Sequence, residues 1–478
     1  MQRLTGLDAS FLYLETPSSH MHVAGLMLLD PSSTEGGVTL EGVKAVYGAR
    51  LHLAPPFRRR LVEVPFGLHH PLWVEDPDFD LDYHIRATAL PSPGTPEQLS
   101  TLVGRLSALP LDRTRPLWEV WVIEGLEDGN VAVLSKVHHA AIDGASGNEL
   151  TVALLDLTPE IATHEPTEEW VPDRIPNELE LLSYAITSLA RQPVRVARAM
   201  TKTAGAAMAV RRLNRAEPNL VPPPSPFSAP RTSFNTAITS RRSFAFTSVS
   251  LPTVKAVKNA AGATVNDVVL ALCAGALRRY LDDHDEHPDG PLVAMVPVSV
   301  RSEDEKDAMG NRVSSTFTSL ATDVDDPVER LEVIHQCMAE VKVQQQAIGA
   351  DTLGDWAEFA APALAGRAAR LYSRTRMADR HRPLFNVTIS NVPGPAFPLY
   401  SIGARMVANF PVGPIMDGGG LNMTVMSYLD QLDFGLQACP DVLPDVWSLA
   451  QGLREALDEL VAATGVGPDE VEKLTRSA

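Results

Sequence analysis

Cysteine is scarce in this chain of 478 residues, and the pattern of its cysteines predicts no cross-link. Cys273, Cys337 and Cys439 are odd in number, lie far apart and lack the spacing of metal ligands. A disulfide framework is therefore not expected, and the chain fits a reducing compartment.

Positive charge is in deficit. The 41 lysines and arginines face 59 aspartates and glutamates, which leaves a net charge of −18 at pH 7. Such a chain repels nucleic-acid phosphates, so general binding to DNA or RNA is not expected. Lysine itself is rare, so arginine is the expected partner of any phosphate or buried carboxylate.

Long apolar runs are missing as well. No stretch approaches the ~18 consecutive apolar residues of a membrane-spanning helix, so the chain is not expected to cross a membrane. The first residues, Met1-Gln2-Arg3-Leu4-Thr5-Gly6, lack the charged and then apolar build of a signal peptide. We therefore expect a cytoplasmic protein, with peripheral attachment to the inner face of a membrane left open.

Several catalytic motifs are also absent. The segment Gly144-Ala145-Ser146-Gly147 has the wrong spacing for the G-x-S-x-G elbow of a serine hydrolase, and no cysteine lies in a recognisable reactive context. The sequence has neither a P-loop nor a G-x-G-x-x-G motif, so nucleotide hydrolysis and dinucleotide redox chemistry are not supported. These absences leave a histidine base, acting directly on a bound nucleophile, as the expected chemistry.

Two adjacent histidines carry the strongest signal in the sequence. They begin the string His138-His139-Ala140-Ala141-Ile142-Asp143-Gly144, and the preceding stretch 131–137 has the composition of a strand. Because a strand end is held by rigid structure, an imidazole there can serve as a general base. The pleat places His138 and His139 on opposite faces, so only one of them can face a given cleft.

Asp143 and Gly144 complete the string. From the spacing alone, Asp143 could bond a ring nitrogen of His139 or pair with an arginine that braces the turn. Gly144 permits the tight backbone that follows. Paired histidines also serve as metal ligands, but the sequence offers no convincing third and fourth ligand. We therefore expect neither a metal nor an organic cofactor.

The chain divides into two halves of comparable size and of mixed α/β character. We expect a first domain over 1–215, a proline-rich linker over 216–232 and a second domain over 233–478. The expected strands are 23–29, 118–123, 131–137, 292–300, 386–390 and 421–428, and the expected helices are 40–51, 145–157 and 264–281. Pro297 lies inside one strand and indicates a sheet edge or a bulge, because proline cannot donate to the ladder.

A basic stretch closes the first domain. From 181 to 216 the chain has seven basic residues and no acidic one. Helical spacing relates its apolar positions, which are Leu182, Ala185, Ile186 and Leu189. We expect an amphipathic helix here, which either packs across the domains or lies on an anionic lipid surface.

These motifs carry a family resemblance. The H-H-x-x-x-D-G string is the hallmark of the CoA-dependent acyltransferase superfamily, which includes chloramphenicol acetyltransferase and peptide-synthetase condensation domains. Further segments are similar to the bacterial wax ester synthase/diacylglycerol acyltransferases, and they follow that family's order: Leu7–Phe11, Phe79–His84, Pro110–Arg113, Pro116–Glu119, Asn266-Asp267, Gly310–Arg312 and Ser390–Pro395. The resemblance covers nearly the whole chain.

The resemblance implies a mixed α/β fold of two chloramphenicol-acetyltransferase-like domains with an active-site tunnel at their interface. By motif match, His139 would be the general base that deprotonates the acceptor hydroxyl, supported structurally by His138, by Gly144 and by Asp143 paired with an arginine. Asn266 would stabilise the oxyanion or position the acceptor. The alternative reading of Asn266 is an amide that only caps the turn at a helix start.

Other matching segments have less specific readings. Pro116, Leu117 and Trp118 are tunnel candidates, although a packing anchor before a strand is the favoured reading. Ser390 and Asn391 would border the tunnel or form an ordinary turn. The arginines between 367 and 382 would meet CoA phosphates or lie on a solvated helix face.

The function that this resemblance implies is O-acyl transfer. A long-chain acyl group would pass from acyl-CoA, as substrate, to diacylglycerol, and a fatty alcohol is the second acceptor. The reaction would proceed in a ternary complex without an acyl-enzyme. Two alternatives stay open: a condensation-type enzyme with a carrier-protein-bound donor, and a non-catalytic lipid-binding protein. Attachment to the inner membrane face or to lipid droplets would follow from the lipid substrates.

Overall fold

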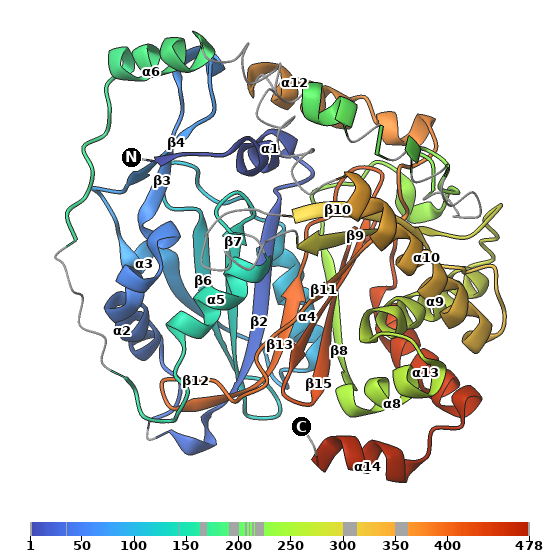
Figure 1. Cartoon of the computed structure of the whole chain (residues 1–478). Coiled ribbons are helices and arrows are strands. Elements are labelled where there is room, and N and C mark those ends of the chain that lie inside the picture. The colour runs from blue at the N-terminus through green and yellow to red at the C-terminus, as the bar shows by residue number, and fades with distance from the viewer. Residues whose placement is uncertain are drawn as a thin grey trace.

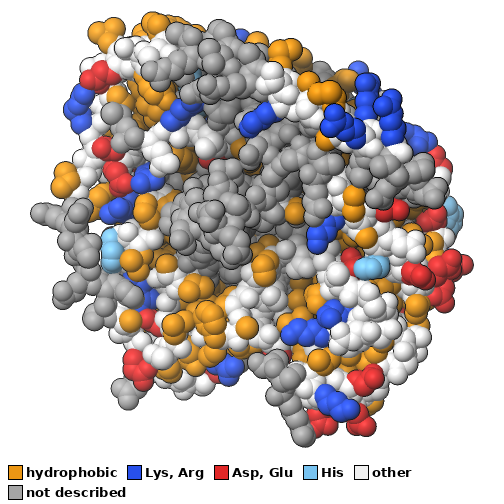
Figure 2. Space-filling view, viewed as in Figure 1, with side chains coloured by type: hydrophobic (Ala, Val, Ile, Leu, Met, Phe, Trp, Pro, Cys, Tyr) orange, Lys and Arg blue, Asp and Glu red, His pale blue; other side chains and the backbone are white. Residues whose placement is uncertain are grey.

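The computed structural model describes residues 2–34, 36–142, 144–162, 170–190, 200–205, 208–209, 211–212, 215, 224–299, 313–348 and 362–476. Two six-stranded sheets stand side by side, each with its own helices, and Figure 1 shows them in the left and right parts of the molecule. On the face seen in Figure 2, charged side chains of both signs are mixed with hydrophobic ones. The predicted mixed α/β class is confirmed.

The first sheet has the strand order β12-β13-β2-β7-β6-β5. Its strands are β2 (His22–Asp30), β5 (Ile85–Ala89), β6 (Trp118–Glu124), β7 (Val131–His138), β12 (Tyr400–Ser401) and β13 (Ala404–Val412). The helices of this half are α1 (Gly6–Leu14), α2 (Leu40–Arg50), α3 (Leu81–His84), α4 (Pro96–Ser107), α5 (Gly144–Leu154) and α6 (Glu178–Ala190). A small sheet joins β1 (Gln2–Arg3), β4 (Leu72–Glu75) and β3 (Arg59–Val62).

The second sheet has the order β10-β9-β11-β14-β15-β8. Its strands are β8 (Ser243–Ser250), β9 (Val293–Ser299), β10 (Val313–Ser319), β11 (Val387–Val392), β14 (Leu421–Tyr428) and β15 (Gln431–Ala438). Its helices are α8 (Leu251–Ala261), α9 (Val265–Asp283), α10 (Pro327–Ile348), α12 (Pro362–Arg374), α13 (Val446–Thr464) and α14 (Pro468–Arg476). The 3-10 turns are η1 (Pro31–Ser33), η2 (Leu51–Leu53), η3 (Pro55–Arg58), η4 (Pro65–Gly67), η5 (Ser233–Asn235) and η7 (Met377–Arg380).

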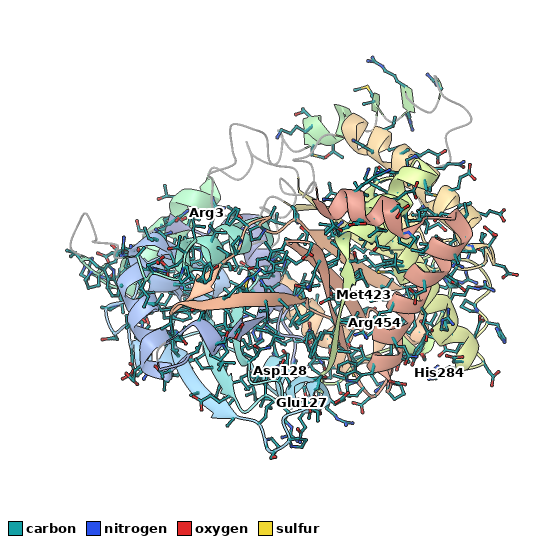
Figure 3. The ribbon with its side chains drawn as sticks, turned by 90° about the horizontal axis from the view of Figure 1, so that it is seen from below. Arg3, Glu127, Asp128, His284, Met423 and Arg454 are labelled. Atoms are coloured by element: carbon teal, nitrogen blue, oxygen red, sulfur yellow. The ribbon has the colours of Figure 1, made fainter. Side chains whose placement is uncertain are left out.

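Helix α9 is the centre of the second half. Thr264 caps its first turn, as the sequence predicts, and the structure adds a reciprocal capping box with Asp267. From Val268 to Leu277 every side chain is buried, and α13 and α10 pack against it. In Figure 3, Met423 lies inside this half, whereas Glu127 and Asp128 lie at the outer tip of the β6–β7 turn. A helix that is apolar all round is the expected occupant of such a core.

The second half contributes two strands, β12 and β13, to the sheet of the first half. Strand β13 comes from the second half but pairs antiparallel with β2, so it completes the sheet that carries the two histidines (Figure 1). At the crossing, a Cβ at Gly435 of β15 would lie 1.8 Å from the carbonyl oxygen of Pro411 on β13. Only glycine allows this backbone approach. The site is therefore built on a sheet that needs both halves.

A buried ion pair ties a third segment to this sheet. Arg50 at the end of α2 binds the carboxylate of Asp156 at 2.5 Å, and the two side chains are 1% and 2% exposed. The backbone N–H of Asp156 donates to the carbonyl of Tyr400 in β12. Because a buried charge without its partner is strongly destabilising, this pair holds α2, the segment after α5 and the exchanged strand in one arrangement.

Two expectations need correction or refinement. Pro297 does not lie on an outer strand, because β9 has neighbours on both sides, but β11 pairs only with Ala294 and Met295 of β9. At Pro297 the strand therefore has one partner, and a missing N–H is tolerated there. In the predicted helical stripe of α6, Ala185 is buried whereas Ile186 is 65% exposed, and Leu189 lies outside the side chains that the structure describes.

Membrane crossing can be judged on the described helices. Among them, no single helix combines the length and apolar composition that a bilayer span needs. Helices α8 and α9 meet the criterion only as a pair bent by 102°.

Candidate active site

His139 follows the last residue of β7, as predicted. Its backbone N–H donates to the carbonyl of Met21 at 2.9 Å, which extends the β2–β7 pairing by one residue. Its ring stacks on Phe11 of α1, with centroids 4.0 Å apart and planes 9° apart. The side chain is partly exposed. Backbone pairing and ring stacking therefore hold an accessible imidazole in one orientation, as a general base requires.

His138 points into a different environment and is 1% exposed. Its Nδ1 accepts the backbone N–H of Ala140 at 2.9 Å, so the ring carries its proton on Nε2. That Nε2–H donates to Oε1 of Glu15 at 2.8 Å. His138 thus joins the turn after His139 to the end of α1.

Glu15 and Arg113 complete this support. One guanidinium nitrogen of Arg113 donates to the second carboxylate oxygen of Glu15 and also to the carbonyl of Leu12. The resulting chain of hydrogen bonds runs from Arg113 through Glu15 and His138 to Ala140. Because α1 carries Phe11, the same network positions both the backbone and the ring of His139.

Burial and charge set the protonation of this network. Burial lowers the pKa of His138, and the hydrogen bond that His138 donates to Glu15 opposes that effect only in part. Burial alone would raise the pKa of Glu15, but the hydrogen bonds and charges of His138 and Arg113 outweigh it and hold that pKa below its ordinary value. At neutral pH the network therefore contains a neutral imidazole, a carboxylate and a guanidinium.

Replacing Glu15 by glutamine is expected to lower the free energy of unfolding by about 2 kcal/mol, because the amide turns one donor toward Arg113. The pKa of Glu15 is lower in the folded than in the unfolded chain, so its contribution is present above pH 4.5 and lost as the pH falls through the folded-state pKa. The destabilisation should therefore shrink toward low pH. Urea unfolding at neutral and acidic pH measures it.

Glu63 offers a matched control for this substitution. It also pairs with Arg113, at 3.7 Å, but its side chain is 64% exposed. An exposed pair contributes little, so Glu63→Gln should leave stability nearly unchanged. Equal losses in the two variants would contradict a special role for Glu15.

The second group of predicted residues meets in the other half. Asn266 lies in the first turn of α9, and Asn391 lies near the carboxyl end of β11. The amide nitrogen of Asn391 donates to Oδ1 of Asn266 at 3.3 Å. With its oxygen occupied in this way, the amide of Asn266 keeps its N–H groups for another acceptor. Ser390 precedes Asn391 and is partly exposed.

Pro116, Leu117 and Trp118 lie in the interior. Trp118 is 1% exposed, stacks on Phe57 and His84, and donates its indole N–H to the carbonyl of Phe57. The carbonyl of Leu117 accepts the backbone N–H of His138. These contacts are those of a packing anchor beside the histidine dyad, His138 and His139. A contact of the three residues with substrate stays a prediction.

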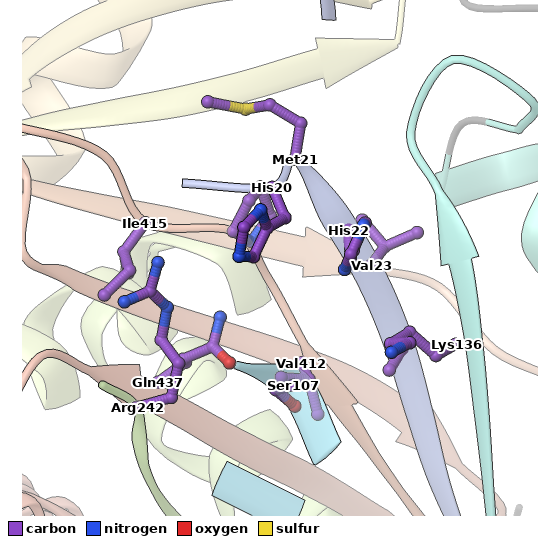
Figure 4. Close-up of a pocket in the computed structure, with 12 residues that line it drawn as sticks. His20, Met21, His22, Val23, Ser107, Lys136, Arg242, Val412, Ile415 and Gln437 are labelled. Atoms are coloured by element: carbon purple, nitrogen blue, oxygen red, sulfur yellow. The ribbon is translucent and has the colours of Figure 1, made fainter. Parts of the chain in front are cut away.

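A small cavity lies behind the dyad, at the boundary of the two halves. Its volume is about 20 Å³, enough for about one water molecule. Figure 4 shows His20, His22 and Lys136 from the first half facing Arg242 and Gln437 from the second. His22 stands edge-on to His138 at 5.7 Å between centroids, and burial holds its pKa well below the ordinary value. A neutral His22 therefore adds no positive charge beside His138.

Comparison with known proteins bears on this site. Residues 4–269 match the family model described as the wax ester synthase/diacylglycerol acyltransferase catalytic domain, and residues 309–461 match the C-terminal domain of the same family. The chain belongs to the wax ester synthase/diacylglycerol acyltransferase family. The resemblance seen in the motifs is thereby confirmed.

Relatives match over nearly their full length. A protein of Mycobacterium tuberculosis strain CDC 1551, named as a "putative" diacylglycerol O-acyltransferase, is 40% identical over 98% of this chain and 92% of its own length. A second protein of strain H37Rv, named as a "probable" diacylglycerol O-acyltransferase, is 39% identical over 96% of this chain and 98% of its own.

Solved structures agree with the family assignment. The wax ester synthase/diacylglycerol acyltransferase of Marinobacter aquaeolei VT8 has a TM-score of 0.66 at 33% identity, covering 97% of this chain and all of that one. The starter condensation domain of rhizomide synthetase has a TM-score of 0.56 at 13% identity, covering 97% and 95%. The second likeness concerns the fold alone.

Not every predicted residue of this family member can be placed. Gly144 begins α5, whereas Asp143 and the Gly310–Arg312 segment lie outside the described residues. The predicted arginine partner of Asp143 therefore stays a prediction. The domain boundaries at 215 and 233 also stay predictions.

Sequence reasoning missed the residues that support the dyad. Phe11 and Arg113 were part of family-like segments, but neither was linked to a histidine, and Glu15 was not singled out. Phe11 and Glu15 lie more than 120 residues before the two histidines, and Arg113 lies 98 residues after Glu15, so no local periodicity relates these residues to the histidines. Their presence beside the motif in the same family pattern was the only available signal.

Proposed function

We propose that this family member is an acyl-CoA-dependent O-acyltransferase that acylates diacylglycerol and, as a second acceptor, fatty alcohols. The observation that carries the proposal is His139, a partly exposed imidazole held at a strand end by Phe11 and by the His138–Glu15 network. The family match along the chain and the names of its relatives support the same class of reaction.

In the proposed reaction, His139 takes the proton of the acceptor hydroxyl as its oxygen attacks the thioester carbonyl. The tetrahedral oxyanion then accepts a hydrogen bond from the amide of Asn266, whose orientation Asn391 sets. Collapse of this intermediate forms the ester bond and breaks the bond to sulfur. The CoA thiolate leaves and takes the proton back from His139, so the base is regenerated without an acyl-enzyme.

The decisive measurement is release of free CoA thiol by the purified chain with palmitoyl-CoA and either 1,2-diacylglycerol or hexadecanol. We expect release that depends on the acceptor, with the corresponding ester as product and a higher rate for diacylglycerol. Palmitoyl-CoA without an acceptor is the control and should give no more than slow hydrolysis.

Each alternative predicts a different outcome. Turnover with a palmitoylated carrier protein but not with palmitoyl-CoA would favour the condensation-type enzyme. Binding of diacylglycerol without CoA release from any donor would favour a non-catalytic lipid-binding protein. Covalent palmitate on the chain after mixing with palmitoyl-CoA alone would contradict the direct attack.

Attachment to a lipid surface also belongs to this proposal, because diacylglycerol and triacylglycerol do not dissolve in water. The predicted contact is the basic stretch 181–215. In the described part of that stretch, Arg211, Arg212 and Arg215 are exposed. Helix α6 uses Leu181 and Tyr184 to pack on the small sheet, and its Ala185 is buried, so it is at least partly a structural helix.

A further inference from the structure

One end of the molecule exposes large apolar side chains. Helix α12 packs against α1 and against η4, and η4 also contacts α6, so the three outer elements adjoin one another at the top of Figure 1. Their exposed apolar residues include Phe66, which is 84% exposed, Leu364 and Leu371 on α12, and Leu179 and Ile186 on α6. Figure 2 shows hydrophobic side chains along this upper rim. We call this surface, with the arginines of α12, the α12–η4 face.

The sequence of α12 is amphipathic in an unusual sense, since its apolar stripe points outward. Leu364, Ala368 and Leu371 are exposed and follow i, i+4, i+7 spacing. On the opposite side Gly366 is buried, and a Cβ there would meet the guanidinium of Arg370 at 3.2 Å and the carbonyl of Tyr13 at 3.8 Å. A helix that packs only to stabilise a core would bury its leucines. Helix α12 instead packs on α1 through Gly366 and exposes its leucines to solvent.

Positive charge flanks that stripe. Arg367, Arg370 and Arg374 are exposed, and within the described part of the chain none of the three forms an ion pair. The arginines that follow α12 differ, because Arg376 pairs with Asp379 and Arg382 pairs with Asp289. A cluster of exposed arginines on a chain with a net charge of −18 is a local feature that favours an anionic partner.

The tip of η4 presents a second apolar group. Phe66 has φ 60° and ψ 8°, a left-handed conformation that is unfavourable for an aromatic residue. That conformation places its ring at the outer end of the β3–β4 connection, 84% exposed. Strained, exposed aromatic side chains concentrate where a surface meets a ligand.

The α12–η4 face is also close to the catalytic base in the structure. Helix α12 packs on α1, and α1 supplies the Phe11 ring that stacks on His139. One helix therefore separates this face from the imidazole. An acceptor that resides in a lipid layer would have a short path to the site.

We propose that the α12–η4 face docks on an anionic phospholipid surface. Phe66, Leu364 and Leu371 insert among the acyl chains, and the three exposed arginines of α12 bind the lipid phosphates. This inference rests on the proposed function, because lipid acceptors give the enzyme its reason to dock there. It assigns the contact to α12 and η4, with the neighbouring apolar residues of α6, and not to the arginines of the basic stretch 181–215.

The test uses the full chain and flotation with vesicles of phosphatidylcholine, with or without phosphatidylglycerol. The R367Q/R370Q/R374Q variant should bind the anionic vesicles about 100-fold more weakly, at roughly fivefold for each arginine. The F66S/L364S/L371S variant should lose about tenfold or more on the same vesicles. R211Q/R212Q/R215Q removes the same charge from the basic stretch and should bind like the wild-type chain.

CoA release with 1-hexanol, which dissolves as monomers, separates this inference from the proposed function. The F66S/L364S/L371S variant should keep wild-type turnover with hexanol and lose turnover with diacylglycerol in vesicles. Wild-type binding by the first arginine variant, or equal losses in the two arginine variants, would overturn the docking face. Absence of turnover by the wild-type chain with every acceptor would instead overturn the proposed function. The flotation assay would still test the docking face, because it measures vesicle binding and not turnover.

Discussion

Replacing His139 by alanine is expected to lower kcat for acyl transfer by about a thousandfold, while the KM for acyl-CoA changes little. The imidazole is proposed to take the acceptor proton in the rate-determining attack, and loss of a positioned general base costs typically 10²–10⁴-fold. The side chain is partly exposed and stacks on one ring, so its removal leaves the core intact. Steady-state CoA release with palmitoyl-CoA and diacylglycerol measures the effect.

Two further variants separate base catalysis from a structural role for His139. His139→Gln keeps much of the side-chain volume but offers no basic nitrogen at neutral pH, so it should be as slow as the alanine variant. Added imidazole should restore part of the rate in the alanine variant only, because glutamine fills the space. Near wild-type turnover in either variant would refute the assignment of the base.

Replacing Asn266 by alanine is expected to lower kcat by about a hundredfold, the usual loss for one donor to a tetrahedral oxyanion. Alanine is a better helix former than asparagine, so the first turn of α9 should persist. The alternative reading, in which the amide only caps the turn, predicts instead a small change in stability and normal kcat. Parallel measurements of kcat and of urea unfolding distinguish the two readings.

Asn391 provides a graded comparison. Its amide donates to Oδ1 of Asn266 at 3.3 Å, so Asn391→Ala should loosen the donor without removing it and lower kcat by about tenfold. In the double variant the loss should match that of Asn266→Ala alone, because Asn391 acts through Asn266. Asn259→Ala, an exposed substitution on α8, is the matched control and should change nothing. Additive losses would contradict the positioning role.

Local signals were sufficient for much of the fold. Strands β2, β6, β7 and β14 lie within one or two residues of the predicted spans, because their apolar runs and the turns between them are local properties. Helix α9 starts where Thr264 predicts it, since a cap needs only the next three residues. In α6 Ala185 is buried and Ile186 is exposed, because apolar residues occur on more than one face of the helix and periodicity alone does not say which face is covered.

The sequence by itself determined the chemistry that this protein can offer: a histidine at a strand end, an asparagine at a helix start, and the motif order of one acyltransferase family. Only the tertiary structure decided how these groups are held. Glu15 reaches His138 across 123 positions, Asn391 reaches Asn266 across 125, and β13 crosses into the sheet of the first half. Contacts at such separations depend on packing of the whole chain, which no local pattern of side chains encodes.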